Sequence, residues 1–278
     1  MKAYTFEQVI AQVNEGKFFE DPEILKLHDK NGRTVAHKQA EQGWTTEDKE
    51  ILMLEDKLGH TVAHEQADQG WITEDKEILK LKNKYNISVA YVQAFRGWTT
   101  EDPEILKIQD KNGWTIAHEQ ADQGWTTEDK EILMLKDKFG TSVAHEQAKQ
   151  DWVTEDKEIL MLKDQHGTSV AYIQARRGWT TEDKEILKLE DDQGVTVAHV
   201  QAEQGWTTED PEILVLATYD GVTVAEVQAE HSGWELEGET RERFIQELQK
   251  NFSKRKAQEV LHNVDKMRKK YFKEALLE

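Results

Sequence analysis

Residues 59–85 have the sequence GHTVAHEQADQGWITEDKEILKLKNKY, and variants of this 27-residue pattern recur along the chain. Tryptophan marks the period at seven positions, and an eighth follows after 28 residues: Trp44, Trp71, Trp98, Trp125, Trp152, Trp179, Trp206 and Trp234. Self-similarity at a fixed period of this size is typical of a solenoid, in which each repeat buries its apolar face against its neighbours. Eight repeats begin at these positions: Gly32, Gly59, Asn86, Gly113, Gly140, Gly167, Gly194 and Gly221.

Each repeat predicts two short helices. The first follows a Thr or Ser such as Thr61, whose hydroxyl can cap the helix start, and ends at a glycine such as Gly70. The second follows an Asp such as Asp75, and proline stands at its first position in three places: Pro22, Pro103 and Pro211. Helices of about eight residues are too short to be stable alone. The sequence therefore predicts an all-α fold, an α-solenoid of about eight two-helix repeats.

The same period predicts the domain organisation. Residues 1–31 contain a degenerate half-repeat and form the expected N-terminal cap, and residues 32–235 contain the eight repeats. Residues 236–278 leave the period, carry more basic than acidic residues after 240, and have apolar residues at helical spacing. We expect these C-terminal amphipathic helices either to cap the last repeat or to form a homo-oligomer or docking contact.

The composition excludes several classes of function. The 278 residues include 36 Lys+Arg, 55 Asp+Glu and no Cys, with a net charge of −19. Without Cys there are no disulfides, thiolate metal sites or cysteine nucleophiles, and we expect a cytoplasmic protein. We see no signal peptide or membrane-spanning run, and the negative charge disfavours direct nucleic acid binding. No nucleophile–base pair, phosphate loop or metal constellation stands out, so we expect a non-enzymatic protein with no cofactor and no metal.

The repeat resembles the bacterial leucine-rich-repeat-variant and HEAT-like helical repeats, in which a V-A-x-x-A helix alternates with a T-x-x-x-x-L-L-type helix. The segment G-x-T-V-A-H-x-Q-A-x-x-G at residues 59–70 is also similar to ankyrin repeats. The period is shorter than that of ankyrin repeats, and the proline usual before their leucine is absent. The resemblance covers residues 5–235, and it implies a protein-binding scaffold.

Histidine and glutamine recur at fixed positions of the first helix. The histidines are His37, His64, His118, His145 and His199, and a glutamine follows two residues later in every repeat. Helices of adjacent repeats pack about 8–10 Å apart, whereas a metal needs ring nitrogens at about 2 Å, so equivalent histidines cannot share an ion. We expect both residues to bond the backbone of a neighbouring repeat.

A T-T-E-D-K-E motif gives seven repeats a group of carboxylates, and it has two interpretations. Carboxylates at a helix start cap free N–H groups and favour the helix dipole. Alternatively, the carboxylates form a DNA-mimic stripe that sequesters a basic nucleic-acid-binding protein, as in inhibitors of phage or mobile-element origin. The candidate stripe consists of Glu47, Asp48, Glu101, Asp102, Glu128, Asp129, Glu155, Asp156, Glu182 and Asp183.

Positions that vary between repeats are the best candidates for specific binding. Two of them flank the turn glycine, and in the middle repeats they are apolar where loops are usually polar: Leu58, Tyr85, Ile87, Trp114 and Phe139. Such a cluster marks either a binding patch or local packing. A second variation places Arg96, Arg176 and Arg177 at the end of the first helix in the third and sixth repeats, either as anion-accepting residues or as the trace of a duplication.

Together these features predict a protein-binding scaffold that uses the apolar loop tips of its middle repeats. The alternative is the acidic DNA mimic. The expected partner is another protein, basic if the acidic stripe is used. A HEAT-like nucleic-acid enzyme is disfavoured by the charge.

Overall fold

A computed structural model describes residues 4–235 and 237–275. The predicted caps also include residues 1–3, 236 and 276–278, which lie outside the described residues. Contacts within the chain divide it into two units, residues 1–138 and 139–278. Each unit is described by itself.

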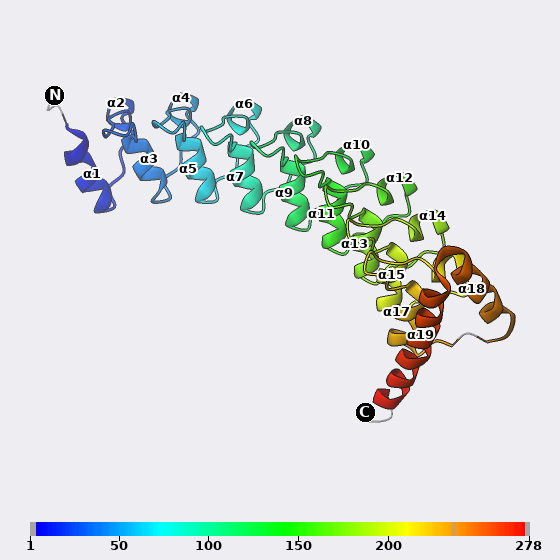
Figure 1. The fold of residues 1–278 in the computed structure, drawn as a ribbon. Coiled ribbons are helices and arrows are strands. Elements are labelled where there is room, and N and C mark those ends of the chain that lie inside the picture. Colours follow the sequence, from blue (N-terminus) through cyan, green and yellow to red (C-terminus); the bar gives the residue numbers. More distant parts are fainter. Residues whose placement is uncertain (1–3, 236, 276–278) are drawn as a thin grey trace. The chain divides into compact units, whose positions relative to one another are not determined.

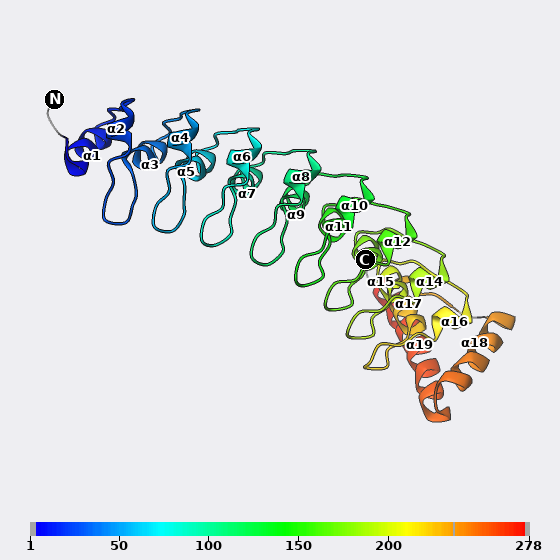
Figure 2. The same cartoon turned by 90° about the horizontal axis from the view of Figure 1, so that it is seen from above.

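The first unit contains ten helices in its described part. Its longer helices are α1 (Phe6–Asn14), α3 (Val35–Ala40), α5 (Val62–Asp68), α7 (Val89–Phe95) and α9 (Ile116–Asp122). One-turn helices alternate with them: α2 (Pro22–Leu25), α4 (Lys49–Leu52), α6 (Lys76–Leu79), α8 (Pro103–Leu106) and α10 (Lys130–Leu133). Within this unit the longer and shorter helices form two rows (Figures 1 and 2).

The second unit continues the same alternation. Its longer helices are α11 (Val143–Lys149), α13 (Val170–Arg176), α15 (Val197–Glu203) and α17 (Val224–Ser232). The one-turn helices are α12 (Lys157–Leu160), α14 (Lys184–Leu187) and α16 (Pro211–Leu214). Two further helices follow the repeats: α18 (Gly238–Asn251) and α19 (Lys254–Ala275). In the described residues of this unit, as of the first, no helix combines the length and apolar character needed to cross a membrane.

Stacking of successive repeats confirms the predicted α-solenoid. In the first unit, α5 contacts α3 on one side and α7 on the other, and in the second unit α13 contacts α11 and α15 in the same way. One apolar cluster shows the principle, since it joins Leu52 of one repeat to Ala63 and Ile78 of the next and Val89 of the third. Similar clusters in both units take side chains from successive repeats, so these repeats bury their apolar faces against one another.

The predicted helix boundaries are confirmed where the sequence supplies a cap. The Thr61 hydroxyl accepts the His64 backbone N–H, and the His64 ring accepts the Thr61 backbone N–H in return. At the other end Gly70 has a φ of 89°, and Asp151, the one replacement for this glycine in the array, takes the same left-handed conformation with a φ of 65°.

The second helix of the first seven repeats is a single turn, which is shorter than the helices of about eight residues that the sequence predicts. The side chain of Asp56 explains the early end of α4. Its Oδ1 accepts the backbone N–H groups of Leu58 and His60 at 2.8 and 3.0 Å. This turn draws the chain into a small hairpin, closed by an isolated β-bridge between Glu55 and Thr61.

Additional helices pack against the two ends of the array. In the first unit, Val9 and Val13 of α1 are fully buried in a cluster with Val35 and Ala36 of α3. In the second unit, α19 packs along α17, and α18 packs against α16. Phe244 and Leu248 of α18 are fully buried there with Leu214, Val215 and Ala225. The C-terminal helices therefore cover apolar surface of the last repeat.

Candidate binding surfaces

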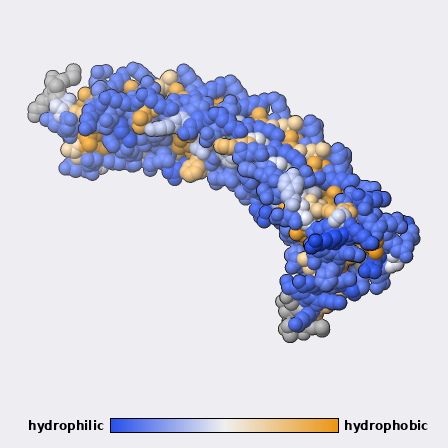
Figure 3. All heavy atoms as spheres, in the orientation of Figure 1, coloured by the Kyte–Doolittle hydropathy of each residue, from blue (hydrophilic) through white to orange (hydrophobic). Residues whose placement is uncertain are grey.

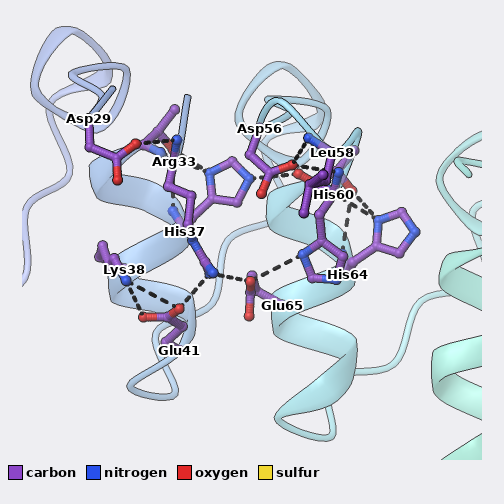
Figure 4. A network of polar contacts seen from close by, with 12 residues as sticks. Asp29, Arg33, His37, Lys38, Glu41, Asp56, Leu58, His60, His64 and Glu65 are labelled. Atoms are coloured by element: carbon purple, nitrogen blue, oxygen red, sulfur yellow. Dashed lines mark hydrogen bonds and ion pairs between the residues drawn. The ribbon is translucent and has the colours of Figure 1, made fainter. Parts of the chain in front are cut away.

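The recurring histidines tie each repeat to the next. In the first repeat the His37 Nδ1 accepts the Thr34 backbone N–H at 3.1 Å, and the Nε2–H donates to the His60 carbonyl of the following repeat at 2.9 Å (Figure 4). His64 bonds the Ile87 carbonyl and His199 the Val222 carbonyl, both at 3.1 Å. These contacts confirm the predicted bonding to a neighbouring repeat. Because Nδ1 accepts a backbone N–H and Nε2 donates to a carbonyl, each of these histidines is neutral and carries its ring proton on Nε2.

Burial keeps these rings neutral. It lowers the pKa of His37, and it lowers the pKa of His64 and of His199 from 6.5 to about 4, against the opposing effect of the carbonyl acceptor. A proton added to such a ring would go to Nδ1, which already accepts a backbone N–H. Protonation therefore opposes the helix cap.

The recurring glutamines also bond backbone, as predicted. The buried Gln39 amide accepts the Phe19 N–H at 2.7 Å and donates to the Phe19 carbonyl at 3.1 Å. Gln228 makes the same pair of bonds with Thr208, at 3.0 and 3.2 Å. In the described parts of the chain, no group of three or more His, Cys, Asp or Glu side chains is placed to hold a metal ion.

Two of the five candidate tip residues, Trp114 and Ile87, are half-buried. The Trp114 indole lies against the His118 ring, with 4.9 Å between ring centroids, and its Nε1–H donates to Glu119 at 3.1 Å. His60 occupies the equivalent position beside His64 and Glu65, and Arg33 of the preceding repeat also pairs with Glu65 (Figure 4). Ile87 stands at this same position and is half-buried too.

The other three candidates stand at the turn itself and are exposed. Leu58 is 51% exposed and Tyr85 is 55% exposed, both in the first unit, and Phe139 is 48% exposed in the second. The Lys84 N–H donates to the Leu58 carbonyl at 2.8 Å, so the tip that carries Tyr85 is bonded to the tip that carries Leu58. The face drawn in Figure 3 is mostly hydrophilic, with small separate apolar spots.

Two of the three candidate anion-accepting arginines have partners in the preceding repeat. Arg96 pairs with Asp68 at 2.8 Å, and Arg177 pairs with Asp151 at 3.2 Å and also donates to the Lys149 carbonyl. Arg176 is exposed at the end of α13. The contacts of Arg96 and Arg177 tie neighbouring repeats together and occupy the guanidinium groups of these two residues.

The aspartates of the candidate acidic stripe cap the one-turn helices. Asp48, Asp102, Asp129, Asp156 and Asp183 are the N-caps of α4, α8, α10, α12 and α14. Lysines of the preceding repeat neutralise several of them, as Lys76 does for Asp102 at 2.5 Å and Lys157 for Asp183 at 3.0 Å. The glutamates of the stripe, Glu47, Glu101, Glu128, Glu155 and Glu182, are exposed, and Glu182 accepts the Trp206 indole N–H at 3.1 Å. This arrangement favours helix capping and gives the DNA-mimic alternative no support.

Sequence reasoning missed three buried carboxylates on the first helices of the repeats. Glu65, Glu119 and Glu146 are nearly inaccessible to solvent, although Glu is rarely buried unless it is paired. Glu119 accepts the Trp114 indole N–H of its own repeat at 3.1 Å. Burial, together with the nearby Glu119 carboxylate, raises the pKa of Tyr91 in the repeat before to about 12. A signal was present, because glutamate recurs directly after the histidine in these three repeats.

Comparison with known proteins adds little to this geometry. No family model and no curated protein matches the sequence. Among solved structures, the ankyrin repeat domain of Bcl-3, described as a unique member of the IkappaB protein family, is similar with a TM-score of 0.32 and 11% sequence identity. The match covers 70% of this chain and 86% of that chain. The repeats and their stacking place this chain in the class of helical repeat proteins.

Proposed function

We propose that this protein is a non-enzymatic scaffold that binds another protein through the apolar tips of its hairpins. The observation that carries the proposal is the exposure of Leu58 and Tyr85 on two successive tips that are hydrogen-bonded to each other. Large apolar side chains that are exposed in the free protein lose contact with water when a partner covers them.

The tips are already ordered before a partner arrives. The Asp56 carboxylate accepts two backbone N–H groups around Leu58, and the Asn83 side chain does the same around Tyr85, with distances of 2.9 Å to the Tyr85 nitrogen and 3.1 Å to the Ile87 nitrogen. Preorganised anchors lose little conformational entropy on binding, which favours affinity. Ile87 and Trp114, half-buried beneath the turns, support the surface, and Phe139 presents an equivalent anchor in the second unit.

The test is an affinity capture that compares three baits. The parent chain is compared with a Leu58→Ser/Tyr85→Ser variant and with an Ile72→Ser/Phe95→Ser control. Ile72 and Phe95 belong to the same unit and are as exposed as the tip residues, at 57% and 58%, but lie outside the hairpins. All three chains are expected to melt alike, because none of the four side chains is buried.

A partner retained by the parent and by the control, but lost by the tip variant, is the expected result from quantitative mass spectrometry. If the three baits retain the same proteins, or if the control loses the partner as well, the hairpin tips are not the binding surface.

A further inference from the structure

In four repeats, the aspartate that starts the one-turn helix uses its two oxygens differently. In Asp75, Oδ1 accepts the Glu77 backbone N–H at 2.9 Å, while Oδ2 lies 2.6 Å from the Lys49 ammonium of the preceding repeat. The same division of oxygens recurs with Lys76 at Asp102, Lys157 at Asp183 and Lys184 at Asp210, with Nζ–Oδ2 distances of 2.5, 3.0 and 2.6 Å. At these four aspartates the array builds an ammonium site and fills it with a lysine of the preceding repeat.

Proline interrupts this pattern before Asp129. Pro103 stands where the other repeats have Lys49 or its equivalents, and proline has no ammonium to offer. The Asp129 Oδ1 still accepts the Glu131 N–H at 2.9 Å and caps α10. Across residues 4–235 and 237–275, neither Asp129 nor Glu101 has an ion-pair partner. Pro22 leaves Asp48 without its lysine in the same way.

Asp129 also lines a pocket between two repeats of the first unit. The pocket has a volume of about 410 Å³, and its walls include Trp125, Leu106, Ile132 and the carboxylates of Glu101 and Asp129. Pockets at equivalent places are lined by Trp71 with Lys49 and, in the second unit, by Trp179 with Lys157. The residues that line the Trp125 pocket include carboxylates but no lysine or arginine.

We propose that the Trp125 pocket binds a lysine side chain of a partner protein, with the ammonium on the Asp129 Oδ2, where neighbouring repeats hold their own lysine. The aliphatic stem of such a lysine would pack on Leu106 and Trp125, and the indole ring attracts a cation at its face. Glu101 and Asp129 make the pocket negative, which selects a cation over a neutral side chain of similar size.

This inference rests on the proposed function in one respect: both proposals require that the partner is a protein. The pocket shares no residue with the hairpin tips Leu58, Tyr85 and Phe139. Loss of tip binding and loss of pocket binding are therefore measured by different variants and different signals.

The test follows the nine Trp indole N–H signals of the full chain by NMR, with the Trp125 signal assigned from a Trp125→Phe variant. The probe is Nα-acetyl-lysine N-methylamide, and the control probe is the norleucine analogue, which has a similar stem but no charge, at constant ionic strength. One exposed ion pair is weak, so millimolar binding is expected. The Trp125 signal should move saturably with the lysine probe, more than the other eight, and should stay in place with the norleucine probe.

Two variants and two matched controls complete the experiment. Pro103→Lys restores the lysine found at this position in five other repeats, and the new side chain should occupy the Trp125 pocket. Pro211→Lys is its control, because it makes the same change at a residue that does not line the pocket. Asp129→Asn keeps a good N-cap but removes the charge, whereas Asp75→Asn removes a charge that Lys49 already neutralises.

Loss of the Trp125 response in Pro103→Lys and Asp129→Asn, with a parental response in both controls, supports the proposal. An equal response to the uncharged probe, a uniform shift of all indole signals, or an unchanged response in Asp129→Asn would overturn it.

Discussion

The recurring histidines make the stability of the array depend on pH in a window set by their burial. The pKa of His199 is lowered from 6.5 to about 4 in the folded chain. Between these values the unfolded chain binds a proton at His199 that the folded chain does not bind. The stability contributed by the neutral ring is therefore complete above pH 6.5 and is lost progressively as the pH falls toward 4.

The variant His199→Gln removes this titration and keeps a capping acceptor, because glutamine is a usual third-position partner of a Thr cap. At pH 7.5 the variant should be about 1 kcal/mol less stable than the parent, since it loses the bond from Nε2 to the Val222 carbonyl. On acidification to pH 5.0 the parent should lose about 2 kcal/mol more than the variant, from the difference between the two pKa values.

The assay is urea unfolding followed by far-UV circular dichroism at the two pH values. Lysines hold the pKa values of Asp75 and Glu104 below their usual range, so these two carboxylates stay ionised at both pH values. His166→Gln, which changes an exposed histidine at a hairpin tip, is the control and should follow the parent at both pH values. If His199→Gln loses as much stability as the parent on acidification, the reasoning from burial is refuted.

Three further changes test the local structure. Thr196→Ala removes the cap of α15 and should lower the free energy of unfolding in urea by about 1 kcal/mol; an unchanged midpoint would contradict the capping role. Asp151→Gly removes the strain of a non-glycine residue with a φ of 65° and should stabilise the chain by about 0.5–1 kcal/mol, although it loses an exposed ion pair with Arg177. A lower melting temperature for this variant would contradict the expected stabilisation. A chain that ends at residue 235 uncovers Leu214 and Val215 and should self-associate in analytical ultracentrifugation; a soluble, folded monomer would show that α18 and α19 are not needed as a cap.

The fold was predictable because its determinants recur at a fixed spacing. Every repeat has a Thr or Ser at the position of Thr61, and most have a glycine at the position of Gly70. Each of these residues acts on backbone within a few positions of itself, so one sequence shows both its place and its role. The length of the second helix was not predictable from helical preference alone. The Asp56 side chain ends that helix by accepting the backbone N–H groups of Leu58 and His60. These two groups come within reach of Asp56 only when the hairpin turn has formed.

The candidate site was only partly predictable, because its contacts join different repeats. The position of Trp114 beside the turn glycine predicts a tip residue that is available for binding. In the structure its indole donates to Glu119 and lies against the His118 ring. Likewise, Lys49 reaches Asp75, which lies almost one full repeat ahead. The stacking register decides such pairs, and a single sequence does not show that register. The exposure of Leu58 and Tyr85 needed only their place at the turn and agreed with the prediction.

The central claim is that the hairpin tips bind a partner protein. Hydrogen–deuterium exchange of the full chain, with and without a partner captured by the parent bait, tests it most directly because it reports where the partner sits. We predict added protection in peptides that cover residues 55–61 and 82–88. Protection confined to the one-turn helices and their T-T-E-D segments, with no change in those hairpins, would contradict the claim.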